Sequence, residues 1–183
     1  ELRKAYPAED ELAINLVPKF WHQTLTGNQD PLSDQQRYLD AIGRHDARQQ
    51  CGIARKKVSL AIVDNWFNTS HPDLQGRIYK QYDAADQDKN ADIPHDGPGW
   101  EHGTVEAGIS AAHIDNNEGI AWVAWDKVKL IVVKSTHDTA KGTDITAGLE
   151  AIAKAVDLGA DIINISWGSP VNSTIVEKVI KKI

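Results

Sequence analysis

Three short apolar runs dominate the hydrophobic pattern of this 183-residue chain. They cover residues 58–63, 128–133 and 160–165, and each is nearly continuous rather than alternating. A continuous apolar run of strand length is typical of a parallel strand that is buried on both faces of a sheet. The pattern therefore predicts three buried parallel strands.

Helical patterns lie between these runs. A single apolar stripe predicts a helix over roughly residues 144–158, with Thr143 as its N-cap and Gly159 as its C′ glycine. A second helix is expected to start near His102 and to run to about Ala112. Strands that alternate with helices at this spacing imply βαβ units. The expected fold is therefore α/β, with a doubly wound parallel sheet.

The two ends of the chain differ from this central part. Residues 1–50 are polar and weakly periodic, so we expect an N-terminal arm or extension packed on a core formed by residues 51–183. A capping-box pattern begins at Thr174, and its apolar face still continues at Ile183. We therefore expect a C-terminally incomplete α/β domain. The outer edge of the 160–165 strand would be unpaired and would promote association.

Charge and hydropathy exclude two classes of partner. A net charge of −6, with only short basic clusters, argues against a nucleic-acid surface. No apolar run approaches the roughly 18 residues that a membrane span needs. Cys51 is the only cysteine, so the chain forms no internal disulfide, and this count assigns no compartment.

Residues suited to catalysis follow the first strand and begin the helix that is expected near residues 102–112. Asp64 comes directly after the buried run, so its carboxylate is expected at the carboxyl edge of the sheet, where ligands of such sheets bind. His102 begins a helical stretch. Taken singly, each has an ordinary structural explanation, as a turn-forming Asp and a helix-start His. The first strand is not followed by a glycine-rich phosphate turn, which argues against a Rossmann nucleotide site.

Four segments together resemble subtilisin-like serine proteases. Residues 58–74 (VSLAIVDNWFNTSHPDL) are similar to the strand that delivers that family's catalytic Asp, and residues 102–108 (HGTVEAG) resemble its catalytic His motif. Residues 116–134 look like the stretch that leads into the next core strand. Residues 162–168 (IINISWG) resemble the strand whose S-x-G segment pairs with substrate. The resemblance covers roughly residues 30–180, with the motifs in the family's order.

The resemblance implies a serine endopeptidase that hydrolyses peptide bonds with an Asp-His-Ser triad and acts on a peptide or protein substrate. Asp64 would orient His102, and His102 would be the general base. This chemistry requires no cofactor. The resemblance also implies a secreted or cell-surface protein. The two edges of the substrate cleft would fall on Ser166, Trp167, Gly168, Gly142 and Thr143.

The serine nucleophile is missing from this pattern. In the family it lies in a G-T-S-x-A-x-P motif, a context that no serine of this chain has, and the oxyanion Asn is expected beyond Ile183. The chain alone is therefore expected to be inactive, with a second chain or segment supplying the rest of the catalytic domain. Trp66 also replaces a usual glycine, and Glu106 a usual valine. These departures keep open a non-catalytic subtilisin-like scaffold that binds a peptide or protein partner.

An acidic loop offers a candidate metal site. Asp83, Asp86 and Asp88 lie in a segment with the oxygen density of a calcium site. The segment is not an EF-hand, because Gly97 stands where the bidentate Glu should fall. Structural calcium, which the resembled family often binds, and an ordinary solvated loop both remain open.

Overall fold

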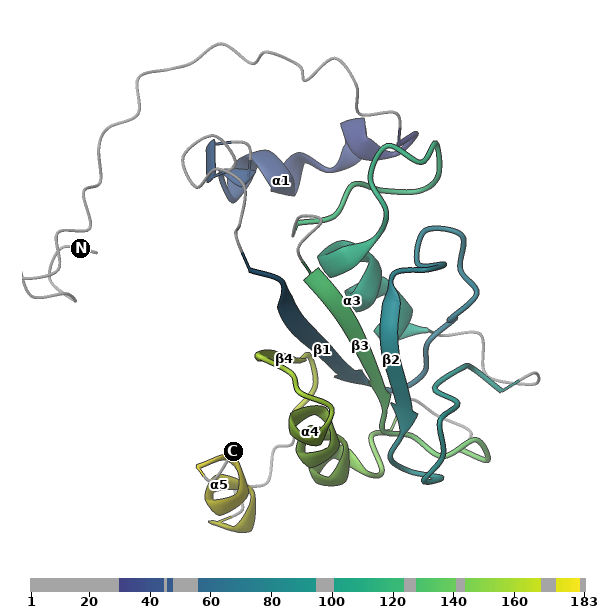
Figure 1. The fold of residues 1–183 in the computed structure, drawn as a ribbon, viewed down its shortest axis with the longest axis vertical. Coiled ribbons are helices and arrows are strands. Elements are labelled where there is room, and N and C mark those ends of the chain that lie inside the picture. Colours follow the sequence, from purple (N-terminus) through teal and green to yellow (C-terminus); the bar gives the residue numbers. More distant parts are fainter. Residues whose placement is uncertain are drawn as a thin grey trace, which may run out of the picture.

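A computed structural model describes residues 30–44, 46–47, 56–94, 101–123, 128–140, 144–168 and 174–181 of the chain. Four parallel strands of this part form one sheet in the order β2-β3-β1-β4 (Figure 1). They are β1 (Val58–Asp64), β2 (Ile78–Asp83), β3 (Val128–Lys134) and β4 (Ile162–Ile165). The helices are η2 (Ser33–Gln35), α1 (Arg37–Ala41), α3 (His102–Ala111), α4 (Gly148–Asp157) and α5 (Thr174–Ile180).

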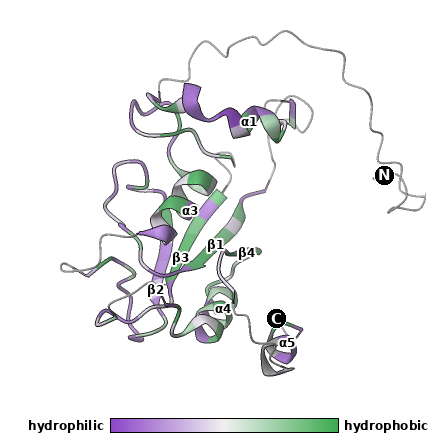
Figure 2. Ribbon diagram, turned by 180° about the vertical axis from the view of Figure 1, so that it is seen from behind, coloured by the Kyte–Doolittle hydropathy of each residue, from purple (hydrophilic) through white to green (hydrophobic). Residues whose placement is uncertain are grey.

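The central strands alternate their side chains between two apolar layers. Ala61 and its register partner Ile131 lie in the layer that α4 covers, whereas Ile62 and its partner Val132 lie in the layer that α3 covers. The sheet interior is accordingly the most hydrophobic part of the ribbon in Figure 2. A helix packs on each face, so the doubly wound α/β fold expected from the sequence is confirmed.

All three strands predicted from continuous apolar runs are present, although β4 is not buried as predicted, and the sequence pattern missed β2. This strand reads Ile-Tyr-Lys-Gln-Tyr-Asp and lies at one edge of the described sheet. Its outward side chains meet solvent, and Tyr79 is exposed. β2 therefore lacks the continuous apolar run that marks a strand buried on both faces.

The helix expected over residues 144–158 begins later than predicted, at Gly148. The backbone amides of Thr146 and Ala147 both donate to the Ser135 carbonyl at 2.9 Å, so this segment is tied to the end of β3 instead of entering the helix. The proposed N-cap Thr143 lies outside the described residues. Gly159 has φ of 85°, which confirms its role as the left-handed residue after the helix.

The described part of the N-terminal arm packs on the loop that follows α3. The Gln36 side-chain amide donates to the Ala121 carbonyl (2.7 Å) and accepts from the Ala121 amide (2.6 Å). The buried carboxylate of Asp30 accepts the amides of Asp115 and Asn116 at 3.0 and 3.1 Å. An arm packed on a core thus fits residues 30–44, while the boundary near residue 50 lies outside the described residues and stays a prediction.

β4 forms the other edge of the described sheet and exposes apolar side chains. Ile162 is 55% exposed and Ile165 is 38% exposed. An unpaired strand edge that carries apolar side chains is a template for association.

We expect Ile162→Lys to reduce self-association of the chain, because it places a charge on this exposed edge. Sedimentation velocity at a series of concentrations measures the effect. Val105→Lys is the matched control, since Val105 is similarly exposed but lies on α3. A wild-type chain that stays monomeric throughout, or an equal effect of both variants, would contradict the assignment of association to the β4 edge.

Candidate active site

Asp64 is the last residue of β1, and its side chain is buried. Its backbone carbonyl accepts hydrogen bonds from both the amide (2.8 Å) and the hydroxyl (2.6 Å) of Ser135, which follows the neighbouring strand β3. One carboxylate oxygen accepts the amide of Asn65 at 2.8 Å. Asp64 is therefore fixed through its backbone and its side chain at the carboxyl edge of the sheet.

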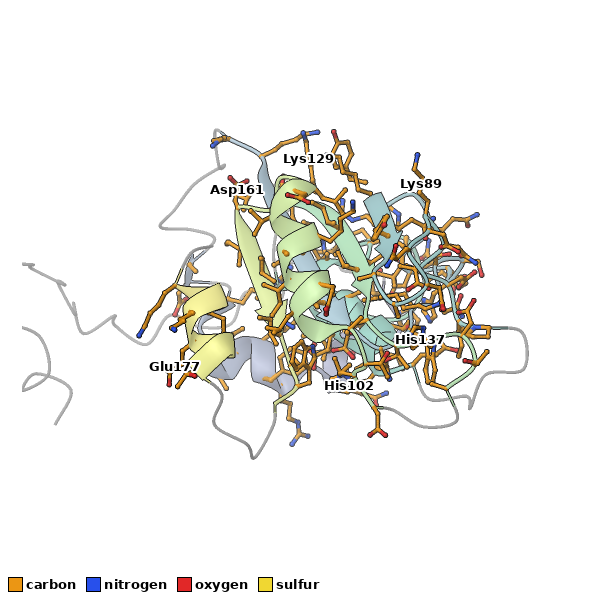
Figure 3. All side chains as sticks on the ribbon, turned by 90° about the horizontal axis from the view of Figure 1, so that it is seen from below. Lys89, His102, Lys129, His137, Asp161 and Glu177 are labelled. Atoms are coloured by element: carbon orange, nitrogen blue, oxygen red, sulfur yellow. The ribbon has the colours of Figure 1, made fainter. Side chains whose placement is uncertain are left out.

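His102 is the first residue of α3, and its ring faces Asp64. The Nδ1 atom lies 2.9 Å from each carboxylate oxygen of Asp64, so the contact that the sequence predicts is confirmed. Asp64 is acceptor-only as a carboxylate, which assigns the proton to Nδ1 and leaves Nε2 as the lone-pair nitrogen of the neutral ring. The His102 side chain is 35% exposed, and Figure 3 shows it at the opposite end of the sheet from Lys129 and Asp161.

Asn65 links the two elements that carry this pair, a role that the sequence did not reveal. Its side-chain oxygen accepts the amide of Trp66 at 2.7 Å and the amide of Gly103 at 3.1 Å. Gly103 is the second residue of α3, so one buried amide joins the end of β1 to the start of the helix. In sequence, an Asn after a strand indicates only a turn.

Gly103 allows α3 to approach the end of β1 closely. A Cβ atom at this position would lie 2.8 Å from the Trp66 carbonyl, 2.8 Å from the Phe67 ring and 3.0 Å from Asp64 Cβ. Distances this short are not tolerated, and the nearest atoms belong to backbone and to a packed ring. The glycine is therefore a spatial requirement of the Asp64–His102 contact.

Trp66 stands where the resembled family usually has glycine, yet the turn does not need a left-handed residue. Among the described residues other than glycine, positive φ angles occur at Gln87, Asp115 and Asn117. Trp66 thus has an ordinary backbone conformation, and its side chain is fully buried. The departure leaves the position of Asp64 intact.

The predicted cleft edge after β4 lies next to this site. β1 and β4 pair up to Val63 and Ile165, so Ser166 follows β4 just as Asp64 ends β1. The indole N–H of Trp167 donates to the Val63 carbonyl at 2.9 Å, which anchors the segment, while Ser166 and Gly168 are exposed. The opposite edge, predicted at Gly142 and Thr143, lies outside the described residues.

A second carboxylate lies near His102 on the next turn of α3. Glu106 Oε1 is 3.6 Å from Nε2, the nitrogen that faces away from Asp64, and the Glu106 side chain is 26% exposed. In the sequence, Glu106 is evident only as a departure from the pattern of the resembled family. The i,i+4 spacing of the two residues on one helix was the signal that could have placed them together.

The three acidic residues proposed as a metal site, Asp83, Asp86 and Asp88, do not all lie together in the structure. The carboxylates of Asp83 and Asp86 gather with Asp138, and Asp88 instead accepts the Asn90 amide at 2.7 Å. The ammonium of Lys134 lies among them. It forms an ion pair with Asp83 Oδ2 at 2.6 Å and a second ion pair with Asp138. A calcium ion would have to displace this ammonium, so these residues do not fit a calcium site as they are arranged.

Lys134 and Asp83 are both fully buried. Burial lowers the pKa of Lys134, but its bonds to Asp138 and Asp83 outweigh that effect and hold the pKa above the ordinary 10.5. Burial raises the pKa of the Asp83 carboxyl despite the ammonium beside it. Nearby, a hydrogen bond from the His137 ring lowers the pKa of Asp86, whose carboxylate lies 2.8 Å from His137 Nδ1. These contacts join the loop after β2 to the loop after β3.

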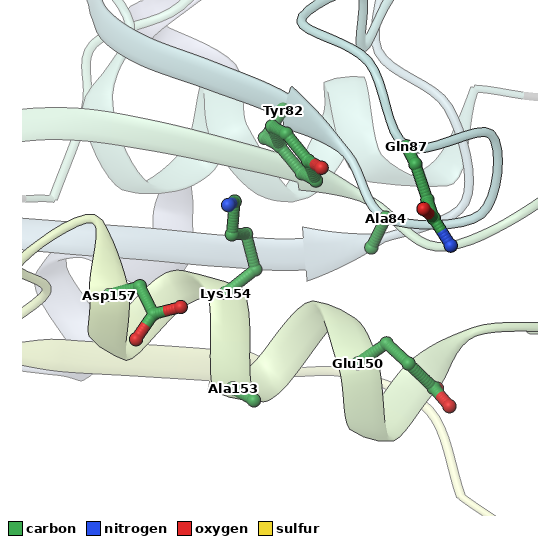
Figure 4. A pocket seen from close by; sticks show the side chains of 7 residues that line it. All are labelled: Tyr82, Ala84, Gln87, Glu150, Ala153, Lys154 and Asp157. Carbon is green, nitrogen blue, oxygen red and sulfur yellow. The ribbon is translucent and has the colours of Figure 1, made fainter.

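A shallow pocket of about 190 Å³ lies between α4 and the end of β2 (Figure 4). The ammonium of Lys154 sits 4.1 Å from the centre of the Tyr82 ring. Neither Asp64 nor His102 contributes to this pocket, so it is separate from the candidate active site. Its lining residues are Tyr82, Ala84, Gln87, Glu150, Ala153, Lys154 and Asp157.

Residues 55–182 match the model of the Subtilase family. The chain belongs to this family. The thermophilic serine proteinase of Bacillus sp. (strain AK1) is 35% identical over 122 residues, which are 66% of this chain and 28% of that protein. Thermitase of Thermoactinomyces vulgaris is 37% identical over 115 residues, which are 63% of this chain and 39% of thermitase. The chain thus spans well under half the length of these relatives.

Solved structures show the same fold. The serine protease of Aeromonas sobria, solved in complex with its chaperone (ORF2), matches 85% of this chain and 30% of its own, with a TM-score of 0.62 and 19% identity. The subtilisin-like parallel sheet with flanking helices is therefore confirmed as the architecture.

Relatives differ in location. The minor extracellular protease Vpr of Bacillus subtilis (strain 168) is 35% identical over 140 residues, 72% of this chain and 16% of that protein. The major intracellular serine protease of the same organism is 34% identical over 122 residues, 65% of this chain and 36% of that protein. Family membership therefore assigns no compartment. None of the helices described in the structure has the length and apolar character to cross a membrane.

We expect Gly103→Ala to separate His102 from Asp64, because the added methyl group would force α3 away from β1. The free energy of unfolding should fall by about 1–3 kcal/mol, and the NMR signal of the hydrogen-bonded His102 Nδ1–H should be lost. Gly108→Ala is the matched control on the same helix, since its Cβ would meet only Ile120 at an ordinary 3.8 Å. Equal behaviour of the two variants would show that close approach at Gly103 is not required.

We expect Lys134→Met to lower the free energy of unfolding by about 3–5 kcal/mol, because it removes the cation from a buried ion pair. Urea denaturation at neutral pH measures this loss, and Lys89→Met, at an exposed position, should change little.

The pH dependence gives a second check of the same ion pair. Since the folded pKa of Lys134 is raised, its contribution is fully present below the ordinary value of 10.5 and is lost as the pH rises through the folded pKa. The wild-type chain should therefore lose stability in this alkaline range, and Lys134→Met should lose less. Parallel curves for the two proteins would contradict the assignment.

Proposed function

We propose that this chain carries the Asp and His of the catalytic triad of a subtilisin-type serine endopeptidase. The observation that supports the proposal best is the contact of the buried Asp64 carboxylate with Nδ1 of the partly exposed His102 ring, at 2.9 Å. In the Asp-His-Ser triad, the Asp holds the imidazole so that Nε2 is available to the nucleophile. Membership in the Subtilase family supports the same assignment.

The roles follow from the geometry. His102 Nε2 would take the proton of a serine hydroxyl as that oxygen attacks the peptide carbonyl, and would return it to the leaving amine. Asp64 would keep the proton of the neutral ring on Nδ1 and stabilise the imidazolium that forms. Its burial strengthens this interaction, since little water screens the pair.

The serine and the oxyanion Asn would come from outside this chain. No serine in it stands in a G-T-S-x-A-x-P context. The matched segments also cover only 28% and 39% of the two relatives described above. We therefore propose that a further segment, or a second chain, supplies the nucleophile, and that the 183 residues alone hydrolyse no peptide bond.

The substrate class proposed is a peptide or protein, bound as an added strand. Ser166 and Gly168 are exposed beside the end of β1, and Trp167 anchors this segment through Val63. An extended peptide gains main-chain hydrogen bonds along such an edge. Gly142 and Thr143 would form the facing edge, no cofactor would be required, and the enzyme would act outside the cell or on its surface.

A non-catalytic scaffold is the second candidate. The observation that favours it is Glu106, which places an anion 3.6 Å from the nitrogen that would meet the nucleophile. Such a protein would bind a peptide along the Ser166–Gly168 segment without cleaving it.

We expect the 183-residue chain to show no labelling by a fluorophosphonate, because it lacks a positioned nucleophile. The longer protein that contains the chain should be labelled at one serine within a G-T-S-x-A-x-P motif. His102→Ala in that protein should lower kcat by about 10⁶-fold, the order that loss of the triad His gives in subtilisin. Mass spectrometry locates the label.

Two outcomes would contradict the endopeptidase. One is stoichiometric labelling of a serine within the 183 residues. The other is a longer protein without the motif that binds peptide and is never labelled, which would establish the scaffold.

A further inference from the structure

The side chains of His102 and Glu106 face one another one turn apart on the exposed side of α3. Their closest atoms, Nε2 and Oε1, are 3.6 Å apart. This separation is too long for a hydrogen bond. Within the described part of the chain, neither Nε2 nor the Glu106 carboxylate takes part in any hydrogen bond. Both groups therefore retain lone pairs for another ligand.

The separation fits two ligands of one metal ion. Zinc binds imidazole nitrogen and carboxylate oxygen at about 2.0–2.2 Å, and at angles of about 109–120° two such ligand atoms lie about 3.3–3.8 Å apart. The observed 3.6 Å falls within this range. Positions i and i+4 of a helix present both ligands on one face, so an ion can bridge them without a change of backbone.

Asp64 supports such a site through the other ring nitrogen of His102, Nδ1. Metal-bound histidines characteristically donate their other ring N–H to a carboxylate, which fixes the ring and makes the ligating nitrogen more basic. Here Nδ1 of His102 lies 2.9 Å from both oxygens of the buried Asp64. The ring is thus held with Nε2 turned outward, and the exposure of 35% for His102 and 26% for Glu106 leaves the pair open to solvent.

We propose that His102 and Glu106 form a binding site for a borderline divalent transition-metal ion such as Zn²⁺. The ion would bind Nε2 of His102 and the carboxylate of Glu106, with water completing its coordination. Asp64 would act as a positioning residue through Nδ1. If the proposed function holds, the metal would occupy the lone pair that accepts the serine proton, so the ion would be a reversible inhibitor of the peptidase.

The acidic group around Lys134 differs from the His102–Glu106 pair as a candidate metal site. Asp83, Asp86 and Asp138 also gather their oxygens, but a buried ammonium already neutralises them. The His102–Glu106 pair has the nitrogen ligand that zinc favours over calcium, and no ammonium among the described residues is bonded to it.

Zinc chloride titrated into the 183-residue chain tests the site without requiring peptidase activity. Two-dimensional NMR of the histidine side chains should show a zinc-dependent shift of His102 Nε2, and calorimetry gives the affinity. Glu106→Gln should weaken binding at His102 by at least about tenfold, and Asp64→Asn by about 10–100-fold. Calcium chloride should leave the His102 signals unchanged, because calcium prefers oxygen ligands.

Two further variants separate this site from other effects. Asp86→Asn removes the other His–carboxylate contact that the structure describes, with His137, and should leave the zinc response of His102 unaltered. Glu106→His keeps the spacing and adds an imidazole, so it should bind zinc at least about tenfold more tightly than Glu106→Gln. Thermal melting confirms that each variant is folded.

The proposal is wrong if zinc shifts only histidines other than His102, or if Glu106→Gln and Glu106→His bind zinc equally. Because these measurements require no serine nucleophile, their outcome does not depend on whether the proposed peptidase function is correct. A chain that binds zinc at His102 while its longer parent lacks peptidase activity would support the site and contradict the proposed function.

Discussion

The contact between His102 and Asp64 depends on the close approach of helix α3 to the end of β1. This approach is possible only because Gly103 has no Cβ atom. The helix starts where the strand stops, and Asn65 joins the two by accepting the Gly103 amide. The sheet supplies the opposite constraint, since Ser135 after β3 fixes the Asp64 carbonyl. Two elements that are 38 residues apart in the chain at their contact therefore behave as one rigid unit. Orientation of this kind is what a general base requires.

Much of this arrangement could be predicted from the sequence because burial leaves a clear pattern. β1 and β3 are covered on both faces, and their residues form continuous apolar runs. The carboxyl ends of parallel strands share one edge, which places Asp64 there. The contact of Asp64 with His102 was predicted from the resemblance to subtilisin-like proteases, since His102 begins a helix and does not end a strand. β2 gave no such signal, because only one of its residues is buried and its sequence is largely polar.

Two contacts that the sequence did not reveal depend on how the chain folds: the ion pair of Asp83 with Lys134, and the approach of Glu106 to His102. Asp83 and Lys134 lie 51 positions apart in the numbering but are register partners at the ends of β2 and β3. That pairing brings the ammonium to the Asp83 carboxylate, whereas the Asp88 carboxylate accepts the Asn90 amide instead. Glu106 was visible in the sequence as a departure from the family, yet its meaning came from the distance to Nε2. A pattern of residue types shows which groups are available, and the fold decides which of them meet.

The Gln36 contact between the arm and the core has a different chemical character from the charged contacts of the molecule, including the one that Asp30 makes beside it. Gln36 uses both halves of its side-chain amide on one residue, donating to the Ala121 carbonyl and accepting from the Ala121 amide, as a neighbouring strand would. This two-way pairing needs a neutral group that is donor and acceptor at once, which a carboxylate or an ammonium is not. The attachment of the arm through this residue is therefore insensitive to acidity and ionic strength. Conditions that loosen the charged loops beside β2 and β3 would leave the Gln36 contact in place, whereas the Asp30 carboxylate, which also anchors the arm, is itself sensitive to acidity.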